Sequence, residues 1–414
     1  MDIALVVYGD IESTSGGFRY DREVVSRLRD RGDSVEVISL PWRRYGRGVA
    51  DALDPRIRDR LDRDVDVLVE DGLCHPSVWR HNRRLSRPNA VVGLVHHVRS
   101  DGPTERYAAL MRPFERRFLR SVDATIATSG FTRRRVERLA PSTTTAPALV
   151  APPAGRAEGA ATTAERVRDR ATQGPLRIVF VGNVVPRKNL ETVLDAVARL
   201  SRSGGSTTGG PRDRGESGTD GVEWRLTVIG SIDGAPSYAQ RLMKRTDVRG
   251  FGDRVEFVGE CDDETLASTL EQSHVCCVPA RYEAFGMVHL EAMEHGTVPI
   301  AGTVGGTGEF VRDGVNGFLV DPDDDQCIAN RLESLATDRD RLAALGCAAL
   351  RTAGDHPTWA ETTDRIRAFL RSAVEDDASD GTPDRGDPGA METAGDAPTD
   401  GDRSRAPGRG GDGK

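Results

Sequence analysis

Residues 178–200 read IVFVGNVVPRKNLETVLDAVARL, an apolar run that passes through a glycine-containing loop into a helical stretch. A short, continuously apolar run suits a strand that is buried on both faces of a parallel sheet. Further strands are expected at residues 3–8, 35–40, 65–69, 90–95, 124–128, 225–229, 255–258, 275–278 and 298–301. Helices are expected at residues 17–30, 56–63, 77–85, 105–120, 131–139, 189–201, 237–245, 263–272 and 285–295. This alternation predicts an α/β fold of parallel, doubly wound sheets.

A stretch rich in proline, alanine, threonine and charge, residues 151–174, separates these units into two groups. We therefore expect a Rossmann-like domain at residues 1–150, a linker at 151–174 and a second Rossmann-like domain at 175–354. An amphipathic helix is expected at 355–373. Residues 203–221 predict a flexible insertion, and residues 374–414 predict a disordered acidic tail, because both lack the apolar residues that a core needs.

The composition argues against several classes of protein. The net charge of the 414 residues is −8, and the tail from residue 375, with eleven acidic and five basic residues, carries most of it, which gives no sign of a nucleic-acid binder. No run of apolar residues is long enough to cross a membrane, and the N-terminus lacks the features of a signal peptide. None of the six cysteines falls in a C-x-x-C pair, so buried free thiols in the cytoplasm are expected, without a metal site.

The strongest motif is RYEAFGMVHLEAM at residues 281–293. Glu283 precedes a helix that is expected to open near Phe285 and Gly286, and Glu291 follows eight residues later, which would put both carboxylates along one side of the element. The amides at such a helix start favour a phosphate or sugar hydroxyls, and Glu291 could accept hydrogen bonds from the vicinal hydroxyls of a ribose. A capped amphipathic helix with two solvated glutamates fits the same pattern.

A second motif, residues 181–190, has the sequence VGNVVPRKNL and joins a strand to a helix. Loops at the carboxyl ends of parallel strands are where ligands bind in open α/β sheets, and Arg187 with Lys188 suits a diphosphate. Because the chain holds only three lysines against 54 arginines, a lysine here is informative. An exposed basic turn is the alternative.

Three weaker signals lie in other predicted loops. Gly16 and Gly17 precede a helix and could form a phosphate-accepting turn, and His96 follows a strand in the first domain, where it could touch a sugar or simply be satisfied by backbone. Gly305 to Glu309 forms a further glycine-rich loop, for which an ordinary loop is the alternative.

In this order, the segments resemble the large family of retaining glycosyltransferases with the GT-B fold, family 4, also called the glycosyl transferases group 1 type. The resemblance rests on these motifs: Gly16-Gly17, His96, Gly182 to Asn189, Glu283 to Met293, Gly296 to Pro299, Gly305 to Glu309, and Gly317 to Val320. It implies two facing Rossmann-like domains, the first on the acceptor side and the second binding the nucleotide sugar, with the last helix returning to the first domain. Two positions depart from the family pattern, Asn183 for an arginine and Asn189 for a glycine.

The resemblance also implies roles for single residues. Catalytic roles would fall to His96, near the donor sugar, to Lys188, on the leaving diphosphate, and to Glu283. Donor binding would involve Gly16, Gly17, Arg187, Phe285, Gly286, Met287, Val288, Glu291 and Glu309. No metal or cofactor is implied, since basic side chains and helix dipoles would do that work.

The expected activity is transfer of a sugar from a nucleotide-sugar donor to a saccharide, lipid-linked or other hydroxyl acceptor, with retention of configuration. A nucleotide-sugar epimerase of GT-B architecture and a non-catalytic sugar-nucleotide-binding protein are the alternatives. Acceptor contacts are expected in loops 41–52 and 97–104. The expected location is the cytoplasm, with peripheral membrane contact through residues 42–45 as an alternative to an exposed loop.

Overall fold

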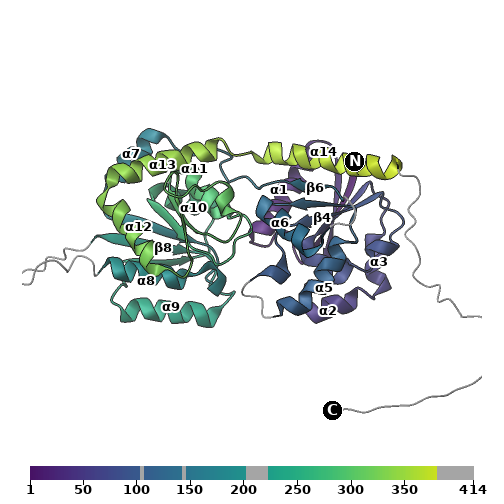
Figure 1. Ribbon diagram of the computed structural model, residues 1–414, viewed down its shortest axis with the longest axis horizontal. Coiled ribbons are helices and arrows are strands. Elements are labelled where there is room, and N and C mark those ends of the chain that lie inside the picture. The colour runs from purple at the N-terminus through teal and green to yellow at the C-terminus, as the bar shows by residue number, and fades with distance from the viewer. Residues whose placement is uncertain (103–106, 142–145, 202–221, 380–414) are drawn as a thin grey trace, which may run out of the picture. The chain divides into compact units, whose positions relative to one another are not determined.

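The computed structural model describes residues 1–102, 107–141, 146–201 and 222–379. The predicted insertion at 203–221 and the predicted tail from residue 380 onward lie outside the described residues. Within the described part, each half of the chain builds one six-stranded parallel sheet, and helices cover both of its faces (Figure 1). This confirms the predicted α/β fold with two doubly wound domains.

The first sheet has the strand order β2-β1-β3-β4-β5-β6. Its strands are β1 (Asp2–Tyr8), β2 (Ser34–Leu40), β3 (Val67–Asp71), β4 (Ala90–Val95), β5 (Ala124–Ala127) and β6 (Ala148–Val150). Its helices are α1 (Gly16–Asp30), α2 (Tyr45–Asp51), α3 (Pro55–Leu61), α4 (His75–Val78), α5 (Ala108–Leu119) and α6 (Gly130–Leu139). Side chains alternate across β1, so that Leu5 packs under α1 while Val6 packs on the opposite face with Ile57 of α3.

The second sheet has the strand order β12-β11-β10-β7-β8-β9. Its strands are β7 (Leu176–Val181), β8 (Trp224–Ile229), β9 (Val255–Gly259), β10 (Val275–Val278), β11 (Val298–Gly302) and β12 (Phe318–Val320). Its helices are α7 (Ala164–Ala171), α8 (Leu190–Leu200), α9 (Pro236–Val248), α10 (Asp263–Gln272), α11 (Met287–Glu294), α12 (Asp325–Thr337) and α13 (Arg339–Gly354). Cys276 and Cys277 lie fully buried in β10, and all six cysteines are free thiols.

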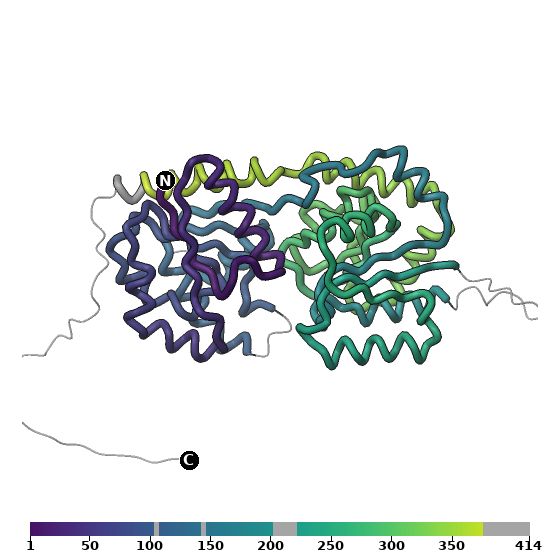
Figure 2. The backbone as a smooth tube through the Cα atoms, turned by 180° about the vertical axis from the view of Figure 1, so that it is seen from behind, coloured from purple at the N-terminus to yellow at the C-terminus, as the bar shows by residue number. Residues whose placement is uncertain are grey.

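The C-terminal helix α14 (Trp359–Ser379) packs on the first sheet. Trp359, Ile366 and Leu370 join the apolar cluster under α1, and Arg367 donates to the buried carboxylate of Asp33 at 2.6 Å. Figure 2 shows α14, the yellow end of the tube, running beside the purple N-terminal segment. The last helix of the described residues thus belongs to the core of the first domain.

Four local predictions need correction. The helix predicted at 77–85 is broken into the short α4 and a separate 3-10 turn, Asn82–Arg84. The predicted linker contains α7, which packs on α13 through Val167. Strand β6 was not predicted, because its three residues are too short to show a period. The final helix continues to Ser379, past the predicted boundary at residue 373.

Among the described helices, none combines the length and the apolar character that crossing a membrane requires.

Candidate functional site

Each sheet has one place where the order of its strands reverses, and the predicted site residues gather at these two places. In the first sheet it lies between β1 and β3, and in the second between β7 and β10, because the chain adds strands first to one side and then to the other. Loops that leave the carboxyl ends of such strands diverge and open a crevice for a ligand. The loops after β7, β10 and β11 carry the second-domain motifs.

Lys188 and Glu283 form a close, largely buried charged pair at this edge of the second sheet. The Lys188 ammonium lies 2.5 Å from Glu283 Oε2, and their side chains are only 14% and 17% exposed. Arg187 approaches the same oxygen at 3.6 Å and donates to the Tyr282 carbonyl at 2.7 Å. Burial works to raise the pKa of Glu283, but Lys188 and Arg187 outweigh it and lower that pKa to about 2. Glu283 is therefore ionised, and Lys188 and Arg187 share this one carboxylate.

Asn189 stands where the pattern of the resembled family has a glycine, and the structure shows why asparagine fits there. Its backbone is left-handed, with φ of +63°, a conformation that glycine adopts freely and asparagine tolerates best among other residues. Its amide nitrogen donates to the carbonyls of Pro279 and Pro322, at 3.3 and 2.5 Å, and its oxygen accepts from Thr192 at 2.9 Å. Asn189 thus ties the basic loop to two neighbouring loops. Asn183, the other departure, is exposed.

The start of α11 faces the glycine pair of the first domain. Gly286 precedes the helix with φ of +96°, and a Cβ there would lie 2.5 Å from Thr307 Oγ1. A Cβ on Gly16 would lie 3.2 Å from the Met287 Cε, so the absence of a side chain lets the two loops meet. The backbone amides of Met287 and Val288 are the first of α11. They have no acceptor within the helix and can therefore donate to a ligand.

The Glu291 carboxylate lies in α11, with its side chain only 5% exposed. It accepts a hydrogen bond from Arg19 of α1 and lies 3.2 Å from Nε of Arg156, which also pairs with Asp263. The predicted ribose-binding carboxylate is therefore held by two arginines in this structure. A ligand hydroxyl at Glu291 has to share the carboxylate with Arg19 or displace it.

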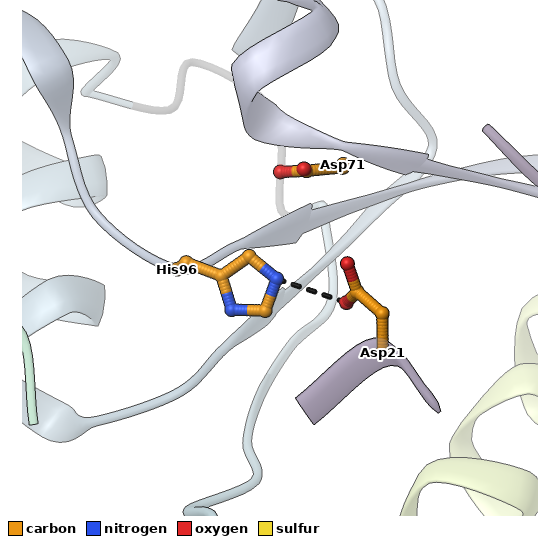
Figure 3. A group of neighbouring side chains, drawn as sticks. All are labelled: Asp21, Asp71 and His96. Carbon is orange, nitrogen blue, oxygen red and sulfur yellow. Dashed lines mark hydrogen bonds and ion pairs between the residues drawn. The ribbon is translucent and has the colours of Figure 1, made fainter. Parts of the chain in front are cut away.

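His96 follows the end of β4 and pairs with Asp21, and Asp71 lies nearby, as Figure 3 shows. Its Nε2 lies 2.9 Å from Asp21 Oδ1, and Asp71, the last residue of β3, lies close by. Asp21, Asp71 and His96 are the one group in the described part of the chain with ligand atoms close enough, within 4.8 Å, for a metal ion. The hydrogen bond joins two of the three residues directly, through His96 Nε2 and Asp21 Oδ1.

The side chains of Glu309 and Phe285 are both engaged in contacts within the protein. The Glu309 carboxylate accepts from the amides of Gly130 and Phe131, at 3.0 and 2.6 Å, and so caps α6 of the first domain. Phe285 is buried against Phe310, with ring centroids 5.0 Å apart, so only its backbone is placed to meet a ligand. Both stay predictions as donor-binding residues.

Glu283 precedes the helix, as predicted: α11 begins at Met287, and Glu283 lies in the loop before it, where it bridges to Gly305. Arg19, Arg156, Asp21 and Asp71 were not predicted. Asp71 is the last residue of β3, and His96 directly follows β4, so the strand-end position of Asp71 could have identified it as a candidate. Asp21 and Arg19 look like ordinary polar residues of an amphipathic helix.

Comparison with protein families gives one match. Residues 162–351 match the family model described as glycosyl transferases group 1, which is the second domain with α7. The D-inositol 3-phosphate glycosyltransferase of Mycobacterium marinum (strain ATCC BAA-535 / M) is 31% identical over 202 residues, which cover 48% of this chain and 39% of that protein. The D-inositol 3-phosphate glycosyltransferase 1 of Catenulispora acidiphila is 36% identical over 146 residues, 35% of this chain and 34% of that protein. The chain thus spans well under half the length of these curated relatives.

Solved structures match nearly the whole chain. Sucrose-phosphate synthase from Thermosynechococcus elongatus has a TM-score of 0.74 at 19% identity, covering 91% of this chain and 99% of that one. HepE of Anabaena, solved in complex with UDP, has a TM-score of 0.70 at 17% identity, covering 90% of this chain and 100% of that one. At this identity the likeness concerns the fold alone. The family match covers the second domain, and the structural likeness extends the shared fold over both domains.

Proposed function

We propose that this protein is a glycosyltransferase that moves a sugar from a nucleotide-sugar donor to a hydroxyl acceptor. The observation that carries the proposal is the cluster of Lys188, Arg187 and Glu283 beside the start of α11, at the strand ends where an open α/β sheet binds ligands. This cluster lies in the stretch that matches the glycosyl transferases group 1 model.

The chemistry that such a site can perform follows from its charges. Glycosyl transfer breaks the bond between the anomeric carbon and a phosphate oxygen, and negative charge accumulates on the departing diphosphate. Lys188, Arg187 and the amides at the start of α11 are cationic or dipolar groups that can stabilise this charge without a metal. Because Glu283 holds Lys188 and Arg187 in place, the cations are positioned before the donor arrives.

We propose that the donor's ribose hydroxyls bind Glu291 and that its sugar lies toward His96 and the Gly16–Gly17 loop. Glu291 is a buried carboxylate in the helix whose first amides would meet the sugar or its phosphates. Glu309 contributes through the loop that it fixes against α6.

Retention of configuration is the stereochemical outcome that we propose. The acceptor oxygen would bond to the anomeric carbon on the face that the diphosphate leaves, and its proton would pass to a diphosphate oxygen. No side chain then has to form a covalent bond to the sugar.

For the acceptor, the first-domain loops are the proposed contact. The relatives named above act on an inositol phosphate, and a phosphorylated or plain polyol is one candidate class. Trp42, 62% exposed next to Arg43 and Arg44, is the feature that favours a lipid-linked acceptor at a membrane surface.

The test is a panel of UDP-, GDP- and ADP-sugars, with binding measured by calorimetry and nucleoside diphosphate release measured with and without hydroxyl acceptors. Wild type is expected to bind one nucleotide class and to release its diphosphate. Glu291→Ala should lose that binding, whereas Arg19→Ala, which breaks the same ion pair from the other side, should keep it.

Each other outcome points elsewhere. Conversion of the donor without an acceptor would indicate an epimerase. Selective binding without turnover would indicate a sugar-nucleotide-binding protein. If no nucleotide sugar binds, the proposed function is wrong.

A further inference from the structure

The His96 imidazole is held in one orientation by contacts from three sides. Its backbone carbonyl accepts hydroxyl hydrogen bonds from Thr128 and Thr132, at 3.1 and 3.3 Å. The ring lies 3.5 Å from the position of a Cβ on Gly17, and the Tyr20 ring packs edge-on with centroids 5.3 Å apart. Only 10% of the side chain is exposed. The ring therefore cannot turn freely to exchange its two nitrogens.

Nε2 is the ring nitrogen of His96 that contacts Asp21. Nε2 lies 2.9 Å from Asp21 Oδ1, and the opposite nitrogen points away from both aspartates in Figure 3. An ionised carboxylate only accepts hydrogen bonds, so Nε2 carries a proton. His96 Nδ1 has no hydrogen bond to any described residue, and the exposed part of the ring leaves room for a ligand atom.

The charge of His96 then decides what Nδ1 can do. If the ring is neutral with its proton on Nε2, Nδ1 is an acceptor and would suit a sugar hydroxyl that donates. If the ring is an imidazolium, Nδ1 carries a proton and donates, with a strength that favours an anionic oxygen.

Two buried carboxylates favour the charged form. Asp21 is fully buried, and its second oxygen, Oδ2, has no hydrogen-bond partner among the described residues. Asp71 is 1% exposed, and one of its carboxylate oxygens lies within 4.8 Å of the nearest polar atoms of Asp21 and His96. An unpaired carboxylate oxygen in a low-dielectric site is unfavourable unless a nearby cation compensates it, and His96 is the cation within reach.

The titratable groups around the ring support this charge. Burial alone would lower the pKa of His96, but the Asp21 carboxylate and, more weakly, Asp71 raise it to about 9. Burial raises the pKa of Asp71 itself. The other titratable neighbours are the Tyr20 phenol, whose pKa burial raises, and His97, whose pKa burial, His96 and nearby arginines lower to about 4, so both are neutral.

We propose that Asp21 and Asp71 are positioning residues that hold His96 as an imidazolium, so that its Nδ1–H donates a hydrogen bond to an anionic oxygen of the ligand. The first domain thereby supplies a cationic donor opposite Lys188 and Arg187, which share the single anion Glu283. The identity of that ligand as a nucleoside diphosphate rests on the proposed function, whereas the charge state of His96 does not.

The experiment is histidine-selective ¹⁵N NMR on the full chain, with the His96 signals assigned by their loss in His96→Gln. In wild type, both ring nitrogens of His96 should stay protonated through neutral pH. Asp21→Asn should lower the pH at which Nδ1 loses its proton by about 1–3 units, because an opposite charge at this range shifts a pKa by that amount. Asp71→Asn should produce a smaller shift in the same direction. Near-UV circular dichroism shows whether each variant is folded.

Asp33→Asn is the matched control, because Asp33 is also a fully buried side chain of the first domain but pairs with the Met1 amine and Arg367. It should leave the His96 titration unchanged. A neutral His96 in wild type, or the same shift in Asp33→Asn as in Asp21→Asn, would overturn the proposal. Displacement of the His96 signals by added Zn²⁺ would also overturn it, since the trio would then be a metal site.

The ligand is tested separately with UDP, GDP and ADP. The nucleotide that binds should shift His96 Nδ1 in wild type, and its affinity should fall as pH rises through the His96 titration. In Asp21→Asn this fall should come at lower pH by the same interval as the NMR shift. A nucleotide that binds without moving Nδ1 would refute the role at the ligand. If none binds, the proposed function fails, while the NMR result still decides the charge of His96.

Discussion

Replacing Lys188 with methionine should destabilise the protein by about 3 kcal/mol near neutral pH. The substitution keeps the length of the side chain but removes the main partner of Glu283, whose carboxylate is 17% exposed and lies 2.5 Å from the ammonium. The pKa of Glu283 falls from its ordinary value of 4.5 to about 2, because the two cations outweigh the effect of burial. At about 1.4 kcal/mol per pH unit, that difference corresponds to about 3 kcal/mol. Arg187, at 3.6 Å, would keep part of this stabilisation, so about 3 kcal/mol is the upper value of the expected loss.

The pH dependence of this loss distinguishes the ion pair from simple packing. In wild type the pKa of Glu283 is depressed, so its contribution to stability is present above about pH 4.5 and is lost as the pH falls toward 2. In Lys188→Met the carboxylate stays buried without its ammonium, so its pKa rises. The difference between the two proteins should therefore be largest near about pH 8 and shrink toward about pH 5, where a proton can replace the missing cation.

Urea unfolding at a series of pH values measures this difference. Lys244→Met is the control, because Lys244 is an exposed lysine on α9 and its loss should change the free energy of unfolding by less than about 0.5 kcal/mol. A loss in Lys188→Met that is constant between about pH 5 and pH 8, or no larger than the control's, would show that the Lys188–Glu283 ion pair is not its cause.

Three further substitutions test the loops around the site. Gly286→Ala should lower the free energy of unfolding by about 2–4 kcal/mol, because φ is +96° and the new Cβ would lie 2.5 Å from Thr307 Oγ1. Asn189→Ala should cost about 2–4 kcal/mol and Asn189→Gly about 1 kcal/mol less, since glycine accepts the left-handed backbone but neither keeps the side-chain hydrogen bonds. Glu309→Ala should cost about 1 kcal/mol, because it uncaps the amides of Gly130 and Phe131. Denaturant unfolding measures all three.

Each of these three stability predictions has an outcome that would contradict it. A Gly286→Ala protein as stable as wild type would mean that the loop before α11 can rearrange without strain. An Asn189→Gly protein less stable than Asn189→Ala would show that the left-handed backbone is not the constraint. A Glu309→Ala protein of unchanged stability that no longer binds nucleotide would move Glu309 from the cap of α6 to the donor.

Much of the fold could be predicted because its strands are buried on both faces. Runs such as residues 90–95 and 275–278 are continuously apolar, and their bounds match β4 and β10. Strand β6 and helix α7 were not predicted, because their sequences show no clear apolar pattern. Three residues next to a proline show no period, and α7 has only Val167 and Ala171 as buried residues among many arginines and other polar side chains.

The site was predicted where its residues are consecutive and missed where they meet only in space. Arg187, Lys188 and Glu283 stand in recognisable strand-end loops. Arg19 and Asp21 lie on one helix among other charged residues, and the sequence does not reveal that one reaches Glu291 and the other His96. Those contacts depend on how α1 is packed, which is set by long-range burial and not by local pattern.

Binding of the donor's ribose at Glu291 can be measured by calorimetry, by comparing nucleoside diphosphates with their 2′,3′-dideoxy forms. If Glu291 holds the ribose, wild type should bind the ribose form more tightly by about 1.5–3 kcal/mol, the range for hydrogen bonds to a charged group. Glu291→Gln should lose most of that preference, and Arg19→Ala should keep it. Equal affinity of wild type for both forms, or an unchanged preference in Glu291→Gln, would contradict the account.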